Sequence, residues 1–241
     1  MARLLDLMLC IFPFEKPLYE KSGLRTEFVG HPLIDALSPK RSGQPRDEEL
    51  IALLPGSRKK EIRKIFPTML AAARIMQERK PTLCFAAAAP SEVIAAEMRA
   101  LLPDAGFCSI TIGAAHDLMD RAGAGMVCSG TATLEAAFFG LPMVILYRTA
   151  WLTWVVGRRL VKVPFLGMPN LLAGREIVRE YLQDAARPEQ IAAEMLRLGN
   201  DPEARKIVQK ELQAAVLQLG GPGAGTRAAI AILRELGLAS P

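Results

Sequence analysis

The stretch "LLPGSRKKEI" (residues 53–62) decides the expected fold of this chain. An apolar run ends at Pro55, the chain turns at Gly56 and Ser57, and Arg58 begins a series of three cations. A short apolar run, a turn that glycine permits and a helical pattern form the strand–turn–helix unit of an α/β protein. The cations directly follow a buried strand, where the free N–H groups of a helix start favour an anion.

The same unit repeats along the middle of the chain. Strand candidates occupy residues 50–55, 82–89, 108–113, 124–130 and 142–148, with helical patterns between them. This alternation predicts an α/β fold with an open parallel sheet flanked by helices. Ligands of such sheets bind beyond the carboxyl ends of the strands, so the site is expected in the loops that follow the strands.

Composition indicates where the domains divide. Residues 1–35 hold two further short strand candidates, and residues 36–49 are rich in Pro, Ser, Gly and charge, which is typical of a linker. The main α/β domain is then expected over residues 50–200. From about residue 175 the pattern is nearly all helical in period, and residues 201–241 are expected to form a helical tail.

The overall composition narrows the class of protein and of partner. Of the 241 residues, 51% are hydrophobic and 6% aromatic, which fits helices on a sheet better than an all-β sandwich. The net charge of +5 suits an anionic ligand or an anionic membrane surface. No basic stripe interleaved with aromatic residues occurs, so a nucleic-acid partner is not expected.

A metal or disulfide site is not expected either. The cysteines form no CxxC pair, which indicates reduced residues of a cytosolic protein. They are Cys10, Cys84, Cys108 and Cys128. His31 and His116 lie far apart, and His116 is interpreted as a surface or helix-cap residue. Asp6 interrupts the apolar start, so a signal peptide is not expected, and no uncharged apolar run reaches the roughly 18 residues that a membrane span needs.

The loop after residues 50–55 is predicted to bind an anion. Gly56 and Ser57 allow a tight turn, and Arg58 can place its planar guanidinium on a phosphate. Cations at a helix N-terminus are disfavoured by roughly 0.3–1 kcal/mol each, a cost that a bound anion would offset. The alternative is a solvated cationic helix start whose charge Glu61 partly balances.

A second loop, at residues 128–131, has similar properties. Gly130 lets a ligand approach the backbone, and Ser129 and Thr131 offer hydroxyl groups. Glu135 lies one helical turn after Thr131 and on the same side, where a carboxylate could accept hydrogen bonds from a ribose diol. The alternative is a helix that Ser129 or Thr131 simply caps.

Four segments resemble those of the lipid-A-disaccharide synthases, in that family's order. They are "FVGHPLID" (28–35), "LLPGSRKKEI" (53–62), "SGTATLEAAFFGLPMVILYR" (129–148) and "VPFLGMPNLLAGREIVREYLQ" (163–183). That family is similar to the B-type glycosyltransferases, in which two Rossmann-like halves face each other across a cleft. The resemblance implies that this chain is the C-terminal, donor-binding half, and that residues 1–35 are the remnant of an N-terminal acceptor domain.

The resemblance also implies a reaction. The family transfers 2,3-diacylglucosamine from UDP-2,3-diacylglucosamine to 2,3-diacylglucosamine 1-phosphate, forming a β-1,6-linked disaccharide and UDP with inversion and without a metal or other cofactor. By this resemblance Arg58 stabilises the leaving diphosphate, together with Gly56, Ser57, Ser129, Gly130 and Thr131, and Glu135 binds the ribose. The general base belongs to the acceptor half and is expected to be absent from this chain.

After the two loops, the third candidate part of the site is "MPNLLAGRE" (168–176), which matches the donor-side segment of the family. It assigns Asn170, Arg175 and Glu176 to the nucleotide-sugar site, and the alternative is a cap by Asn170 with two solvated charges. Tyr147 and Arg148 end a strand nearby and are expected to line the same cleft. His31 is interpreted as shaping the hinge between the two halves.

Residues 149–168 carry tryptophans and aliphatic residues beside arginines and a lysine. This pattern suits an interfacial element on an anionic leaflet, and the alternatives are a shelter for an acyl chain or an ordinary buried helix. Because both family substrates are lipids, we expect a cytoplasmic protein in peripheral contact with the inner membrane. The oligomeric state is open, with a homo-oligomer as one alternative.

Two other functions remain open from the sequence. One is a different UDP-sugar enzyme of the same architecture, such as an epimerase or a transferase that makes peptidoglycan precursors. The other is a non-catalytic nucleotide-sugar-binding fragment that needs a separate N-terminal partner. A comparison of acylated with plain UDP-sugars as substrates would distinguish the first alternative from a lipid-A-disaccharide synthase. Turnover that is restored by adding a separately expressed N-terminal half would test the second.

Overall fold

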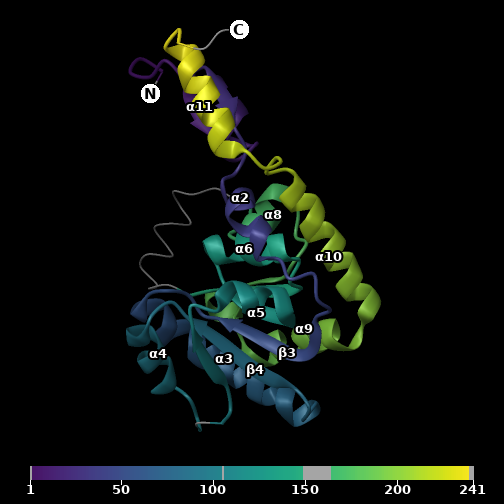
Figure 1. Cartoon of the computed structure of the whole chain (residues 1–241). Coiled ribbons are helices and arrows are strands. Elements are labelled where there is room, and N and C mark those ends of the chain that lie inside the picture. Colours follow the sequence, from purple (N-terminus) through teal and green to yellow (C-terminus); the bar gives the residue numbers. More distant parts are fainter. Residues whose placement is uncertain (1, 105, 149–163, 239–241) are drawn as a thin grey trace. The chain divides into compact units, whose positions relative to one another are not determined.

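A computed structural model describes residues 2–104, 106–148 and 164–238 (Figure 1). The chain divides into two compact units. The larger is Ser42–Gln213, and the smaller combines Met1–Arg41 with Ala214–Pro241. The division predicted from composition, with a linker at 36–49 and a tail from 201, stays a prediction.

The larger unit is built on a six-stranded parallel sheet with strand order β5-β4-β3-β6-β7-β8. The strands are β3 (Asp47–Leu54), β4 (Cys84–Ala89), β5 (Ser109–Ile112), β6 (Ala122–Cys128), β7 (Met143–Tyr147) and β8 (Glu180–Leu182). The predicted parallel sheet is confirmed. The expectation of a nearly all-helical pattern from residue 175 is wrong at β8, because the short segment pairs with β7 through Leu146 and Tyr181.

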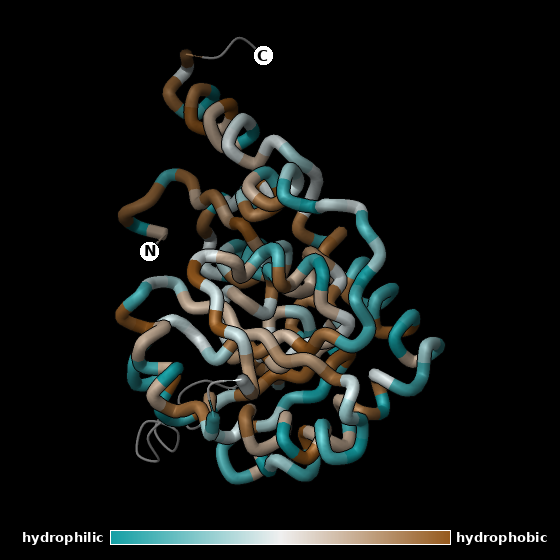
Figure 2. Tube along the Cα trace, turned by 60° about the horizontal axis from the view of Figure 1, so that its bottom comes forward, coloured by the Kyte–Doolittle hydropathy of each residue, from teal (hydrophilic) through white to brown (hydrophobic). Residues whose placement is uncertain are grey.

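Helices cover both faces of this sheet. They are α3 (Lys59–Arg79), α4 (Glu92–Arg99), α5 (Ala115–Arg121), α6 (Thr131–Phe139), α8 (Met168–Ala173), α9 (Pro188–Asn200) and the first part of α10 (Pro202–Leu217), with a 3₁₀ turn at Gln183–Ala185. The main hydrophobic core joins α3, α4 and α9 to one face of the sheet, and α5 and α6 pack together on the other. Figure 2 shows the apolar strands inside and hydrophilic residues on the surrounding helices.

The central strands are buried because they carry small and aliphatic residues. All seven residues of β6 are buried, and its glycines leave room for close neighbours. A Cβ atom at Gly125 would lie 2.8 Å from a methyl group of Leu141. Apolar side chains on both faces are typical of a parallel strand covered by helices on each side.

Arg46 joins the ends of two helices just before β3 begins. Its guanidinium donates to the carbonyl oxygens of Met119 (2.8 Å) and Ala122 (2.7 Å) at the end of α5. It also donates to the carbonyl oxygen of Phe139 at the end of α6. A cation at a helix C-terminus satisfies carbonyl groups that have no partner within the helix.

The smaller unit joins the two ends of the chain. It contains β1 (Met8–Cys10), α1 (Glu15–Glu20), β2 (Thr26–Phe28), α2 (Leu33–Leu37), a 3₁₀ turn at Ser38–Lys40, the last residues of α10 and α11 (Ala224–Glu235). β1 and β2 pair in parallel. Asp35 accepts the backbone N–H groups of Gly223 (2.7 Å) and Ala224 (3.1 Å) at the start of α11.

His31 belongs to this smaller unit. Its Nδ1 accepts the backbone N–H of Leu33 at 3.1 Å, and its ring lies 4.9 Å from that of Phe12, centroid to centroid. Burial lowers the pKa of His31 below its usual value, so the ring is neutral at pH 7. Its assignment to a hinge stays a prediction.

None of the helices in the described part of the chain is long and apolar enough to cross a bilayer. The segment predicted to lie at a membrane surface has most of its defining residues in 149–163, outside the described residues. These are Trp151, Trp154, Val155, Val156, Arg158, Arg159 and Lys162.

Candidate functional site

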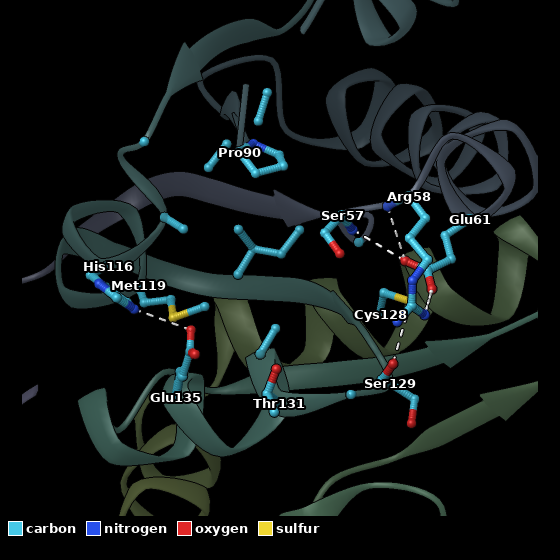
Figure 3. A pocket seen from close by; sticks show the side chains of 18 residues that line it. Ser57, Arg58, Glu61, Pro90, His116, Met119, Cys128, Ser129, Thr131 and Glu135 are labelled. Atoms are coloured by element: carbon cyan, nitrogen blue, oxygen red, sulfur yellow. Dashed lines mark hydrogen bonds and ion pairs between the residues drawn. The ribbon is translucent and has the colours of Figure 1, made fainter. Parts of the chain in front are cut away.

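A pocket of about 550 Å³ lies beyond the carboxyl ends of β3, β4 and β6 (Figure 3). β3 and β6 are neighbours in the sheet. From β3 the chain continues to β4 and β5 on one side, and from β6 it continues to β7 and β8 on the other side. This is the topological switch point, where open α/β sheets bind their ligands. The pocket brings together the predicted residues of both loops, namely Gly56, Ser57, Arg58, Ser129, Gly130, Thr131 and Glu135.

The β3–α3 loop forms a cluster of hydrogen-bond donors. Gly56 has φ of +110°, which glycine adopts readily, and Arg58 is the residue before the first turn of α3. The carboxylate of Glu61 accepts the backbone N–H groups of Ser57 (3.1 Å) and Arg58 (3.3 Å). It also accepts Nη1 of the Arg58 guanidinium at 2.9 Å. The loop therefore converges on an anion, which here is a carboxylate of the chain itself.

These contacts match the alternative in which Glu61 balances the positive charge of the loop. The Arg58 side chain remains 80% exposed, so solvent screens the pair and the guanidinium has room to turn. Lys59 and Lys60 are exposed as well. Binding of an external anion by Gly56, Ser57 and Arg58 stays a prediction.

The β6–α6 loop presents the N-terminus of a helix to the pocket. Gly130 precedes α6 with φ of +148°, and no side chain among the described residues caps the helix. The hydroxyl of Ser129 instead donates to the carbonyl oxygen of Leu166 at 2.9 Å. The alternative in which Ser129 or Thr131 caps α6 is therefore wrong. The uncapped N–H groups and the helix dipole favour an anion at this point.

Glu135 contacts His116, a histidine that was not predicted to belong to the site. Nε2 of His116, in the first turn of α5, lies 3.1 Å from Oε2 of Glu135. Both side chains line the pocket and are less than one third exposed. The interpretation of His116 as a surface or cap residue is wrong. Its place directly after the carboxyl end of β5, at "GAAH" (113–116), is the signal that could have indicated the site.

The remaining wall of the pocket is largely apolar. It includes Ala88, Pro90 and Met119, which follow or face the strand ends, and Cys128 at the end of β6. Burial, reinforced by the nearby Glu61 charge and opposed by Arg58, raises the pKa of Cys128 to about 12. The thiol is therefore protonated at neutral pH. In the described ranges, no group of three or more His, Cys, Asp or Glu residues is arranged to hold a metal ion.

Asn170 is not a residue of this pocket. Its side chain is fully buried, and its amide nitrogen donates to the carbonyl oxygen of Val178 and to Glu180, both at 2.8 Å. Its Oδ1 accepts the N–H groups of Ile177 (2.8 Å) and Val178 (3.1 Å). Because an amide offers two donors and two acceptor sites, no polar atom is left for a ligand. The structure gives Asn170 a structural role, and its assignment to ligand binding stays a prediction that this geometry does not support.

The structure does not bring the other outlying residues to the pocket either. Arg175 pairs with Glu211, and Glu176 pairs with Arg179 at 3.2 Å, all at the surface. Their assignment to the donor site stays a prediction that this geometry does not support.

Tyr147 and Arg148 are half-buried at the end of β7 and do not line the pocket. Arg148 donates to the Thr68 hydroxyl at 2.8 Å and to the Gln183 carbonyl at 3.4 Å. These bonds tie β7 to α3 and to the turn after β8. Their expected place along the ligand cleft stays a prediction.

Solved structures resemble the fold of this chain at low sequence identity. A complex of S. aureus MnaA with UDP matches with a TM-score of 0.66 at 14% identity, covering 100% of this chain and 63% of that one. The calicheamicin glycosyltransferase CalG4 matches with a TM-score of 0.58 at 20% identity, covering 98% of this chain and 53% of that one. These likenesses establish the Rossmann-like α/β fold of the chain.

Sequence comparison gives a more specific result. A lipid-A-disaccharide synthase of Syntrophus aciditrophicus is 39% identical over 95% of this chain and 63% of its own length. That of Geobacter metallireducens is 38% identical over 98% of this chain and 64% of its own length. The chain thus spans a little under two thirds of these relatives. The family model described as lipid-A-disaccharide synthetase matches residues 1–234. The chain therefore belongs to the lipid-A-disaccharide synthetase family.

Proposed function

We propose that this chain binds the UDP-sugar donor of a lipid-A-disaccharide synthase. The reaction would transfer 2,3-diacylglucosamine from its UDP conjugate to the 6-hydroxyl of 2,3-diacylglucosamine 1-phosphate. The observation that carries the proposal is the convergence of two helix N-termini, those of α3 and α6, and of Arg58 on one pocket. Such an arrangement favours a ligand with adjacent negative charges, as in a diphosphate.

The diphosphate would bind at the end of the pocket formed by the β3–α3 loop. Arg58 would leave Glu61 and donate to phosphate oxygens, and the start of α6 at Gly130 and Thr131 would add backbone N–H groups. The similar fold of MnaA, whose structure contains UDP, supports a uridine nucleotide as the ligand class. Glu135 would accept hydrogen bonds from the ribose hydroxyls at the other end.

The proposed chemical step is a direct displacement at the donor sugar. The acceptor 6-hydroxyl attacks the anomeric carbon of the donor, the bond to the UDP oxygen breaks, and the electron pair leaves with UDP. Arg58 and the two helix ends would stabilise the charge that develops on the leaving diphosphate. The base that takes the hydroxyl proton is not assigned to this chain. Since both substrates carry acyl chains, the proposal includes peripheral contact with the cytoplasmic face of the inner membrane.

Calorimetric titration of the chain with UDP tests the proposal. We expect binding in the micromolar to low millimolar range, and a loss of about tenfold or more in Arg58→Ala, as for a lost hydrogen bond to a charged group. Arg63→Ala is the matched control, because Arg63 lies on the same helix but pairs with Glu97 outside the pocket. A folded chain that binds no UDP would refute the proposal.

A further inference from the structure

We propose that His116 is a positioning residue that makes the pocket select ribose over 2′-deoxyribose, by fixing the carboxylate of Glu135. The inference rests on the proposed function, because it concerns the sugar of the bound nucleotide. It goes further in assigning a role to a residue on a different helix, α5, and in naming the ligand feature that this residue would read.

The contact between the two side chains restricts the carboxylate. An ionised carboxylate only accepts hydrogen bonds, so at the 3.1 Å distance Nε2 of His116 donates to Oε2 of Glu135. The imidazole is itself supported by Phe139, whose ring centroid lies 5.8 Å away. Glu135 is thereby held in one rotamer, with its second oxygen, Oε1, left to accept from a ligand.

The pair occupies the correct part of the pocket for a sugar. In Figure 3, His116 and Glu135 lie at one end, Arg58 and Glu61 lie at the other, and Thr131 lies between them. All five residues line the same cavity. A nucleoside diphosphate whose phosphates contact Arg58 and the start of α6 would extend its sugar toward Glu135.

A fixed carboxylate discriminates better than a mobile one. When the ligand lacks the 2′-hydroxyl, an acceptor that cannot turn away loses one of the hydrogen bonds that it would accept from the ribose, and this raises the free energy of the complex. A carboxylate free to rotate would turn to solvent and recover a hydrogen bond from water. Removing His116 should therefore reduce the preference for ribose more than it reduces binding in general.

The test compares UDP with 2′-deoxy-UDP by calorimetry on the whole chain. For the unmodified chain we expect UDP to bind about tenfold more tightly, the scale of one hydrogen bond to a charged acceptor. In His116→Ala the ratio should fall to about threefold or less. His116→Gln, whose amide nitrogen can replace Nε2 as a donor, should restore most of the ratio.

Two controls make the outcome specific. Glu135→Gln removes the charged acceptor and should lower the ratio as well. Arg121→Ala, at the far end of α5 and paired with Asp117 at the surface, should leave it unchanged. Thermal unfolding of each variant identifies any that fail to fold.

The results separate this inference from the function on which it rests. If His116→Ala weakens both nucleotides equally and the ratio persists, His116 only supports the fold and the inference is overturned. The same holds if the unmodified chain binds both nucleotides equally. If the unmodified chain binds neither nucleotide, the proposed function fails and the inference fails with it.

Discussion

Arg58 and Glu61 form an ion pair across the first turn of α3, with Nη1 of Arg58 2.9 Å from Oε1 of Glu61. The same carboxylate accepts the backbone N–H groups of Ser57 and Arg58. The donors of the β3–α3 loop that the proposed function assigns to a diphosphate are therefore bound to a carboxylate of the chain. A ligand must exchange with Glu61, and the strength of this internal contact then sets part of the affinity.

Replacing this competing carboxylate should tighten nucleotide binding. We expect Glu61→Gln to lower the Kd for UDP by about three- to tenfold, because it removes a negative charge from the loop proposed to bind the phosphates. Calorimetry with uridine, which lacks phosphates, should show no change. In the Arg58→Ala background the gain should largely vanish. Weaker UDP binding by Glu61→Gln would mean instead that Glu61 mainly holds the loop in its binding conformation.

Asn170 should matter for stability rather than for binding. Asn170→Ala would leave the N–H groups of Ile177 and Val178 unpaired in a buried site, and we expect it to cost about 2–4 kcal/mol of unfolding free energy. Urea denaturation measures this loss. Arg175→Ala, which removes only a surface pair, should change stability by less than about 1 kcal/mol. A loss of UDP affinity without a loss of stability in Asn170→Ala would contradict the structural role.

Gly130 should be sensitive to substitution for conformational reasons alone. Its φ of +148° and ψ of −164° are accessible almost only to glycine, whereas a Cβ atom there would meet nothing within 4 Å. Gly130→Ala should therefore destabilise the chain by about 1–3 kcal/mol through backbone strain. Gly199→Ala, in the open last turn of α9, is the control and should be neutral or stabilising. Equal unfolding midpoints for the two variants would rule out the strain.

The cysteines should differ sharply in reactivity. Burial raises the pKa of Cys108 and of Cys128 to about 12, so below that pH these thiols are protonated and poorly nucleophilic. Burial also raises the pKa of Cys10, whereas Cys84 is exposed. Brief treatment with iodoacetamide at pH 8, followed by intact-mass measurement, should add one group, and Cys84→Ser should abolish it. Rapid modification of Cys128 would show that the strand end is open to solvent.

The two loops of the pocket could be predicted because their signals are local. At Gly56 and at Gly130 an apolar run, a glycine and a helical pattern follow one another within a few residues. The parallel sheet then brings the carboxyl ends of β3 and β6 together. No long-range information beyond the α/β pattern is needed for this step.

The remaining parts of the site depend on packing that the sequence does not display. His116 and Glu135 lie 19 positions apart, and they meet only because α5 packs against α6. Asn170 is a polar residue in an apolar segment, which is typical both of ligand-binding residues and of residues with a structural role. A polar side chain in an apolar segment needs partners, and the sequence alone does not tell whether they are a ligand or the backbone at Ile177 and Val178. The short β8 has too few residues to give a strand pattern.

Arg46 bears on the entropy of binding. Its guanidinium holds the carbonyl ends of α5 and α6, and these two helices carry His116 and Glu135. The relative position of these helices is therefore ordered when the chain folds, and little further ordering is required when a ligand arrives. A weak contact, such as one hydrogen bond from a sugar hydroxyl to a carboxylate, contributes to affinity when the carboxylate is already ordered before the ligand binds. The segment before β3, which does not line the pocket, thus preorganises the part of the pocket that His116 and Glu135 line.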